Sequence, residues 1–317
     1  MPPSAALRPL PAARSPRPFI RHALGLLLLG AGLWASQGTA RATTTVVEAI
    51  QLPAWVERNG QRRAAEPGVQ LRANDKAITA GDARMLLRMS DRSMIKLGEN
   101  TEFLIEKLAV RQPQAAGPSE LSATLRLVTG VFRYATDYSS KALGNKRELN
   151  LKMATATVGI RGTDFWSMTD AAHDAVCMFE GKVEVVRDAK PGVMLDKPGA
   201  FWVVFTGQPE QPAGQATPEQ LAKFIGQAEL APGSGIVLEG GRWRVVAAER
   251  AGVANASRLR TQLQAAGYPA EMMAKSGGHE VRINQLATQA DAQAVLAALQ
   301  ARTELGLTRA RVALAAE

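Results

Sequence analysis

The sequence predicts a multidomain protein with an all-β N-terminal region of stacked hairpins and a C-terminal α+β domain with a split βαβ fold. Three observations predict this architecture. Short strand-like runs separated by turn residues fill residues 47–205. A linker rich in Pro, Gly and Gln follows at residues 206–240. Residues 241–314 then contain an internal repeat of a strand followed by a helix.

Residues 1–42 have the pattern of a secretory signal peptide. A basic, Pro-rich leader ends at Arg21-His22, an apolar stretch covers Ala23–Ala35, and Ala40-Arg41-Ala42 matches a cleavage site. The alternative is an uncleaved membrane anchor, but the apolar stretch is shorter than the roughly 20 residues that span a bilayer. We therefore expect cleavage, a periplasmic location and no transmembrane span in the mature chain.

The net charge of the 317-residue chain, +9, comes largely from that leader. Its five arginines have no acidic counterpart, and the rest of the sequence has 33 basic and 29 acidic side chains. This balance is too small and too dispersed to attract a polyanion, so we exclude nucleic acid as a partner. The composition, 46% hydrophobic and 21% charged, is typical of a folded chain.

Residues that could support catalysis or metal binding are scattered. Cys177 is the single cysteine, so no internal disulfide can form, and its apolar neighbours indicate a small buried side chain. His22, His173 and His279 lie in different regions, without zinc-ligand spacing. Neither a phosphate-binding glycine loop nor a nucleophile elbow occurs. We expect a non-enzymatic protein that uses no metal or cofactor.

Turn residues recur at short intervals along the β-rich region. Segments such as Ser90–Ser93 and Gly98–Asn100 separate short apolar runs, a spacing that predicts successive hairpins. Residues 109–120 contain Pro and Gly and predict an exposed loop. The expected strands are residues 85–89, 94–97, 101–108, 121–128, 131–134 and 149–154.

The linker contains a predicted short helix. Thr217 is suited to cap its N-terminus, Pro218 to occupy the first position, and Gln220 to complete a capping box. The helix should dock on another part of the protein, because its apolar residues share one face. These residues are Leu221, Phe224, Ile225 and Ala228.

The C-terminal repeat relates Val245 to Val281, 36 positions apart, and the same offset links later apolar positions. It predicts helices at Asn255–Ala266 and Thr288–Leu299, with Asn255 and Thr288 as N-caps and Gly267 ending the first helix. The expected strands are Arg242–Ala248, Tyr268–Lys275, Glu280–Ile283 and Arg309–Leu314. Both helices would cover one face of the sheet and leave the other as a binding platform. Alternatively, the linker helix or the β region covers that face.

Four segments of the β region carry a family resemblance. They are Ile78–Asp82, Leu125–Gly130 with Arg133, Val158–Phe165 and Phe179–Val185. In this combination the region resembles a FecR domain, an extracytoplasmic all-β module. One departure is Arg92, where the family often has Gly. Because side chains disfavour positive φ, we expect a different turn there.

The best-known FecR protein passes a signal from an outer-membrane transporter to a cytoplasmic sigma factor, and it needs a retained membrane span. We expect neither that span nor a cytoplasmic segment here, so direct sigma-factor control does not follow from the resemblance.

Residues 241–314 resemble a SPOR domain, an envelope module that binds glycan strands of peptidoglycan lacking stem peptides. The repeat, the segment Arg242–Val245 and Gly267 carry this resemblance. The first strand lacks the family's usual Gln, Gly and Ser, and Glu280 replaces an Arg in the third. These changes fall on outward positions, so the resemblance implies the fold with an altered glycan-reading surface.

The candidates for glycan contact are Trp243, Arg244, Glu280 and Arg282. Arg and Glu side chains can form paired hydrogen bonds with sugar hydroxyls. The alternative is that they are solvated charges, paired across strands with little energetic effect. Trp243 shares the parity of the core valines, which favours a core or rim position over a stacking platform.

The polar turn Arg161-Gly162-Thr163-Asp164 and the hinge Glu180-Gly181 form a second candidate site, for structure or for a partner. Gly permits unusual backbone angles, and Thr and Asp can bond backbone N–H groups in a turn. Arg161 can pair with Asp164 or another acid. The apolar flanks favour a structural role over ligand binding.

These features predict a secreted cell-envelope binding protein. Its FecR-like scaffold or partner-recognition domain would be tethered to peptidoglycan glycan by the SPOR-like domain. One alternative is an envelope signalling or assembly protein whose SPOR-like domain binds protein. Another is a surface protein with a FecR-like ligand-binding domain. The expected partners are glycan strands and envelope proteins.

Overall fold

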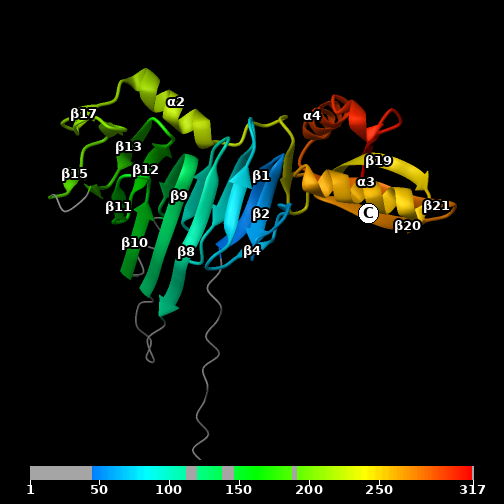
Figure 1. Cartoon of the computed structure of the whole chain (residues 1–317), viewed down its shortest axis with the longest axis horizontal. Helices are drawn as coiled ribbons and strands as arrows, with labels where there is room; N and C mark the ends of the chain where they lie inside the picture. The colour runs from blue at the N-terminus through cyan, green and yellow to red at the C-terminus, as the bar shows by residue number, and fades with distance from the viewer. Residues whose placement is uncertain (1–44, 112–119, 138–145, 188–190, 316–317) are drawn as a thin grey trace, which may run out of the picture. The chain divides into compact units, whose positions relative to one another are not determined.

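The computed structural model describes residues 45–111, 120–137, 146–187 and 191–315 (Figure 1). The predicted signal peptide and most of the loop expected at 109–120 lie outside the described residues. No helix in the described part of the chain has the length and apolar character needed to cross a membrane. The predicted fold class, an all-β region followed by an α+β domain, is confirmed.

The β region consists of two sheets whose inner faces share one core. Phe103 and Phe132 lie on different sheets, and their rings stack with centroids 5.6 Å apart. Sheet 1 has the order β3 (Gln61–Ala64), β2 (Ala54–Arg58), β5 (Lys76–Thr79), β8 (Glu102–Arg111), β9 (Glu120–Ala135), β10 (Lys146–Lys152), β11 (Thr157–Ile160), β14 (Val183–Val186) and β15 (Val193–Leu195). Sheet 2 has the order β4 (Gln70–Leu71), β1 (Thr45–Gln51), β6 (Arg84–Arg88), β7 (Met94–Leu97), β9, β12 (Asp164–Thr169), β13 (His173–Glu180), β16 (Ala200–Phe205) and β17 (Gly214–Gln215).

Strand β9 belongs to both sheets, whereas the sequence predicted two separate strands. Its first part pairs with β8 and β10, and its last six residues pair with β7 and β12. The change of sheet occurs at Gly130, where φ is +97° and a Cβ would lie 2.3 Å from Thr101 Oγ1. Only glycine fits this bend, because both the backbone angle and the available space exclude a side chain.

The order of pairing also corrects the expected run of successive hairpins. Strands β6 and β7 do form a hairpin, but β7 then pairs with β9 rather than with β8. Strand β8 pairs with β5 and β9 in the other sheet. The spacing of turn residues predicted where the strands lie, but it could not predict which distant strands pair with each other.

The turn at Arg92 differs from expectation as well. Arg92 adopts φ of +67° although it carries a side chain. The Asp91 carboxylate accepts hydrogen bonds from the Ser93 backbone N–H at 3.0 Å and from the Ser93 hydroxyl at 2.8 Å. The expectation of a different turn was wrong, because these bonds hold the left-handed conformation without glycine.

Helix α2 (Pro218–Ala228) forms as predicted, with Thr217 as N-cap and Gln220 completing the capping box. It packs on the outer face of sheet 2, next to β12 and β13 (Figure 1). The Phe224 ring stacks on Trp166 at 4.1 Å and on Phe201 at 5.7 Å. Ile225 remains 37% exposed, so the docked face is narrower than the predicted one.

The C-terminal domain has the predicted βαββαβ order. Its antiparallel sheet runs β20 (Ala270–Lys275), β21 (Gly278–Leu286), β19 (Trp243–Ala251) and β22 (Arg311–Leu314). Helices α3 (Val253–Ala265) and α4 (Gln289–Gln300) pack on one face, and a 3₁₀ turn (Thr303–Leu305) precedes the last strand. Val245 and Val281, equivalent in the repeat, are both fully buried there.

The helix ends confirm two of the three predicted signals. Thr288 caps α4 in a capping box with Asp291. Gly267 follows α3 with φ of +85°. The N-cap of α3 is Gly252 rather than Asn255, because β19 extends to Ala251 and the helix begins at once.

Strand β18 (Ile236–Leu238) joins the two regions. It pairs with β1 over three residues, and Val237 also pairs with Leu286 of β21. The backbone of Ala54 donates to Gly267 O at 3.1 Å, and Trp55 Nε1 donates to Ala265 O at 3.0 Å. The last part of the linker is therefore built into the fold, because β18 pairs with strands of both regions.

Candidate binding surfaces

The four candidate glycan residues do not share one surface. Arg244, Glu280 and Arg282 lie on the face of the C-terminal sheet opposite α3 and α4, together with Val246, the cross-strand neighbour of Arg282. Trp243 lies on the helix-covered side and packs against the core cluster. The structure thus brings three of the four side chains to one face.

Arg282 lies at the centre of this face. Its guanidinium donates from Nη1 to Glu280 Oε1 at 3.3 Å and lies 3.8 Å from Glu271 Oε2. Glu271 in turn accepts from Asn284 Nδ2 at 2.7 Å. Only 15% of the Arg282 side chain is exposed, and Glu280 is 7% exposed. The pairing across strands that the alternative predicted is therefore present, but Arg282 and Glu280 are largely buried rather than freely solvated.

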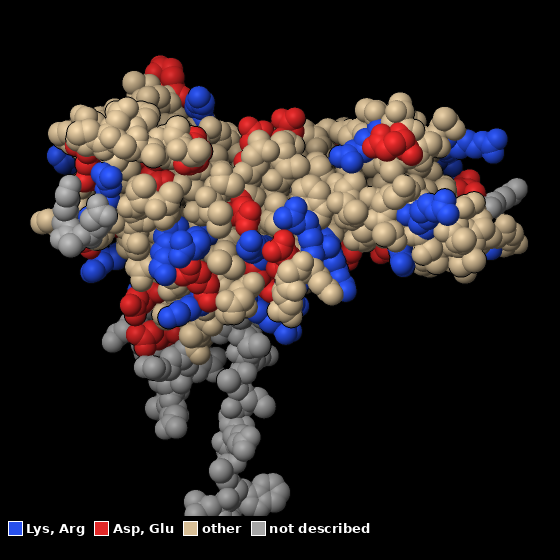
Figure 2. Space-filling view, in the orientation of Figure 1, with Lys and Arg blue, Asp and Glu red and all other residues tan. Residues whose placement is uncertain are grey.

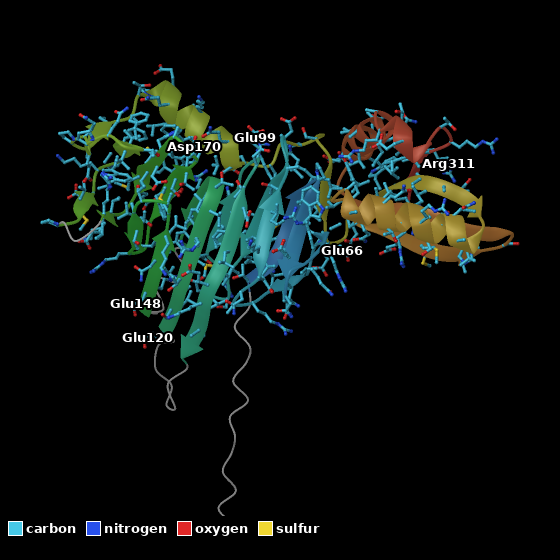
Figure 3. All side chains as sticks on the ribbon, viewed as in Figure 1. Glu66, Glu99, Glu120, Glu148, Asp170 and Arg311 are labelled. Atoms are coloured by element: carbon cyan, nitrogen blue, oxygen red, sulfur yellow. The ribbon has the colours of Figure 1, made fainter. Side chains whose placement is uncertain are left out.

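Two donors on this face lack a protein acceptor. The Nε atoms of Arg244 and Arg282 are buried and form no hydrogen bond with a described residue. Farther out on the same sheet, Arg311 pairs with Glu249 and extends from the domain (Figure 3). The face therefore combines fixed ion pairs with two buried guanidinium donors that no described residue satisfies.

The second candidate site lies where β11 turns into β12. Gly162 has φ of +67°, and the Thr163 backbone N–H donates to Thr136 Oγ1 at 3.0 Å. Thr163 is 2% exposed, and its hydroxyl has no described partner. Arg161 is exposed.

Asp164 pairs with Arg133 rather than with Arg161, which was one of the two pairings considered for Arg161. The Arg133 guanidinium donates to both carboxylate oxygens of Asp164, at 2.9 and 2.7 Å. A third donor, Nη1, reaches Glu229 at 2.7 Å, and Glu229 also pairs with Lys96. Hydrogen bonding to Asp164 raises the pKa of Arg133. The sequence could not show this link, because Glu229 follows α2, far along the chain.

The hinge Glu180-Gly181 packs against the same turn. Gly181 has φ of +88°, and a Cβ there would lie 2.7 Å from Gly162 O and 3.0 Å from Thr163 Cγ2. Asp164 and Glu180 are cross-strand partners at a β-bulge. The two motifs thus form one closely packed corner. Exposed Arg161 and Glu180 are the side chains that a partner could reach there.

Among the described residues, no group of three or more His, Cys, Asp or Glu side chains is placed to hold a metal ion. Cys177 is buried, and that burial raises the pKa of its thiol to about 12. A thiol with so high a pKa is almost entirely protonated near neutral pH and is a poor nucleophile.

Two protein-family models match separate parts of the chain. The model described as FecR protein matches residues 75–184, and the SPOR domain model matches residues 239–306. Both resemblances seen in the sequence motifs are confirmed. The first match includes the corner at Gly162 and Gly181, and the second includes Arg244, Glu280 and Arg282.

Similarity to solved structures is distant. Two crystal structures of a candidate anti-sigma factor from Parabacteroides distasonis ATCC 8503 each align with a TM-score of 0.36 and 14% identity. The alignments cover 72% and 76% of this chain and 92% and 98% of theirs. At this level they support no functional argument. No protein with a curated description matches the chain.

Proposed function

We propose, on the premise that this chain carries a FecR region followed by a SPOR domain, that it is a secreted, periplasmic binding protein of the cell envelope. Both are families of non-enzymatic regulatory or binding domains associated with the envelope. The SPOR domain would tether the protein to glycan strands of peptidoglycan. The FecR region would serve as a scaffold that recognises an envelope protein.

One observation carries the tethering proposal. The sheet face opposite α3 and α4 presents Arg282 held between the carboxylates of Glu280 and Glu271, with Arg244 on the neighbouring strand. Sugar hydroxyls can both donate and accept, so a row of fixed carboxylates and guanidinium groups can satisfy them in pairs. The near balance of charge on this face favours a neutral glycan over a polyanion.

Retention on cell-wall sacculi tests the tether. The chain from residue 43 onward is incubated with sacculi that an amidase has stripped of stem peptides, and with untreated sacculi. We expect retention mainly on the stripped sacculi. The double variant Arg244→Ala/Arg282→Ala should lose it, with at least a tenfold weaker apparent affinity.

The matched control is Arg258→Ala, because Arg258 is an exposed arginine on α3, on the other side of the domain. It should bind like the unmodified chain. If the unmodified chain is not retained, the tethering proposal fails. If the double variant binds as well as the control, glycan is not read by this face.

A second candidate function is envelope signalling or assembly, in which the SPOR domain binds protein. The observation that favours it is Glu280, which replaces a family arginine and neutralises Arg282 at 3.3 Å. A surface protein with a FecR-like ligand-binding domain is a third candidate. Cell fractionation and a fluorescent fusion distinguish these locations. Septal enrichment that disappears when residues 241–317 are deleted would support glycan targeting.

A further inference from the structure

A groove of about 1220 Å³ lies between the β2–β3 hairpin and the C-terminal domain. One wall includes Val56 and Arg63, and the other includes Arg260, Gln264 and Met272. Glu66 lies at its border, between the strands and α3 (Figure 3). Glu271 lines this groove and also lies beside Arg282 on the face proposed to bind glycan, whereas the corner at Gly162 lies outside the groove.

The two walls are held together by specific contacts. Trp55 of β2 donates to Ala265 O at the end of α3, and Ala54 donates to Gly267 O. The Trp55 ring also lies so close to Gly267 that a Cβ at that position would be 2.8 Å from it. Contacts this close hold β2 against the end of α3.

Two sheet edges meet at this groove. Among the described strands, β3 pairs only with β2, and β20 pairs only with β21. Strands β20 and β21 are joined by the two-residue turn Ser276-Gly277, and hydrogen-bonded pairs alternate along such a ladder. The alternation directs the backbone N–H and C=O of Met272 and Ala274 away from β21. These groups can pair with one more strand.

The charged side chains on the groove walls indicate which kind of side chain the added strand has. Two acidic side chains, Glu66 and Glu271, line the groove, but Glu271 already accepts from Asn284 and lies 3.8 Å from Arg282. Arg63 and Arg260 are exposed, face the groove from opposite sides and form no ion pair with a described residue, so basic charge exceeds the charge of Glu66. Arg58, by contrast, is paired with Asp75 at 2.6 Å. Figure 2 shows basic side chains gathered near the strands beside the C-terminal domain. Met273, 41% exposed, adds an apolar contact on β20.

We propose that this groove binds an extended, acidic segment of a partner protein as an added strand on the free edge of β20. The segment's backbone pairs with Met272 and Ala274, and its carboxylates pair with Arg63 and Arg260. Alternate side chains of a strand face opposite ways, so acidic and apolar residues should alternate in the segment.

A fluorescein-labelled peptide of alternating glutamate and valine is the probe, and fluorescence anisotropy with the chain from residue 43 onward is the measurement. We expect saturable binding that weakens as salt is added. The variant Arg63→Glu/Arg260→Glu should bind at least tenfold more weakly. The control Arg258→Glu places the same charge on α3 outside the groove and should change binding less than twofold. Circular dichroism melting checks that each variant is folded.

A peptide N-methylated at alternate amides separates strand addition from simple charge attraction, because it keeps every carboxylate but loses backbone donors. It should bind at least tenfold more weakly. Equal binding of the methylated peptide, or of a lysine–valine peptide, would overturn the proposal. The proposal would also be overturned if the peptide showed no saturable binding. It would likewise be overturned if sedimentation showed a dimer in which two copies of the chain pair through β20. Retention on stripped sacculi should be the same in all these variants, so this test and the test of the tether fail independently.

Discussion

Gly267 shows how much one residue contributes to the contact between the two regions. Its φ of +85° costs little for glycine and about 1–2 kcal/mol for a residue with a side chain. In addition, a Cβ would lie 2.8 Å from the Trp55 ring and 2.9 Å from Pro53 Cβ. Conformation and space therefore both require glycine at this position.

Substitution by alanine separates the two requirements. Gly277 has a nearly identical φ of +82°, but a Cβ at that position would have no other atom within 4 Å. Gly277→Ala should lower the free energy of unfolding by about 1–2 kcal/mol, from conformation alone. Gly267→Ala should lower it by about 3 kcal/mol or more, because overpacking is added. Urea denaturation measures both, and equal losses would show that the Trp55 contact adjusts freely.

The buried Cys177 gives a pH-dependent prediction. Burial raises the pKa of its thiol from 9.0 in the unfolded chain to about 12 in the folded one. Between these values the unfolded state releases the proton first, so stability present below pH 9 is lost as the pH rises towards 12. Thiolate absorbance during an alkaline titration should rise near pH 12 in the folded protein. In Cys177→Ala, stability should fall less steeply over that interval. An unchanged slope would contradict the assignment.

Single residues also show where prediction from the sequence stops. The glycines at 162 and 181 were predicted as special turn positions from the residue type alone, and both have positive φ. The positive φ of Arg92 was not predicted, because hydrogen bonds between Asp91 and Ser93 stabilise it and the conformational preference of arginine alone does not reveal them. The partner of Asp164 was also missed, since Arg133 reaches it from another strand.

At the level of elements, Asp291 joins a helix to the segment that precedes the domain. It is fully buried in the first turn of α4. One carboxylate oxygen accepts from the backbone N–H groups of Gly233, Gly235 and Ile236 at 2.9, 3.1 and 3.0 Å. The other accepts from the Thr288 backbone and hydroxyl. The same side chain thus caps α4 and positions the start of β18.

Removing this carboxylate should cost more than removing the ordinary helix cap. Thr288→Ala should lower the unfolding free energy by about 1 kcal/mol, as expected for an N-cap. Asp291→Ala should lower it by about 3 kcal/mol or more, because it leaves several buried N–H groups without an acceptor. Chemical denaturation of both variants gives the comparison. Similar losses would mean that the bonds to residues 233–236 contribute little.

Elements with strong local signals were predicted well from the sequence. Helices α2 and α4 begin at capping boxes that can be read from four consecutive residues. The start of α3 was missed by two residues because its N-cap, Gly252, has no side chain to signal it. The clustering of Arg244, Glu280 and Arg282 followed from strand parity, but Glu271 and Asn284 joined them only through the register of β20 and β21.

At the level of the whole molecule, the described β region and C-terminal domain share a strand and a core. Val237 is fully buried between Ile50 of β1 and Leu286 of β21. Core residues of both regions belong to one continuous hydrophobic cluster. Regions coupled in this way should unfold together.

Calorimetry should therefore show a single unfolding transition for the chain from residue 43 onward. Val237→Pro removes a backbone donor from the middle of the shared strand and should split the transition in two. Gln215→Pro is the control, since β17 is an edge strand that pairs with β16 and, among the described strands, with neither β1 nor β18. It should lower the melting temperature slightly and leave one transition. Two transitions in the unmodified chain would refute the coupling.

The ladder between β1 and β18 also decides how the protein would respond to tension. Under the proposed tethering, a load on the C-terminal domain would reach the β region through Ile236–Leu238 and through the contacts of Ala54 and Trp55. Hydrogen bonds of an antiparallel pair run perpendicular to the strands, so a load along β18 acts on all of them at once. The hydrogen bonds are then loaded together in shear and do not break one after another. A tethered chain of this kind would transmit mechanical strain from the wall into its β region instead of absorbing it in a slack linker.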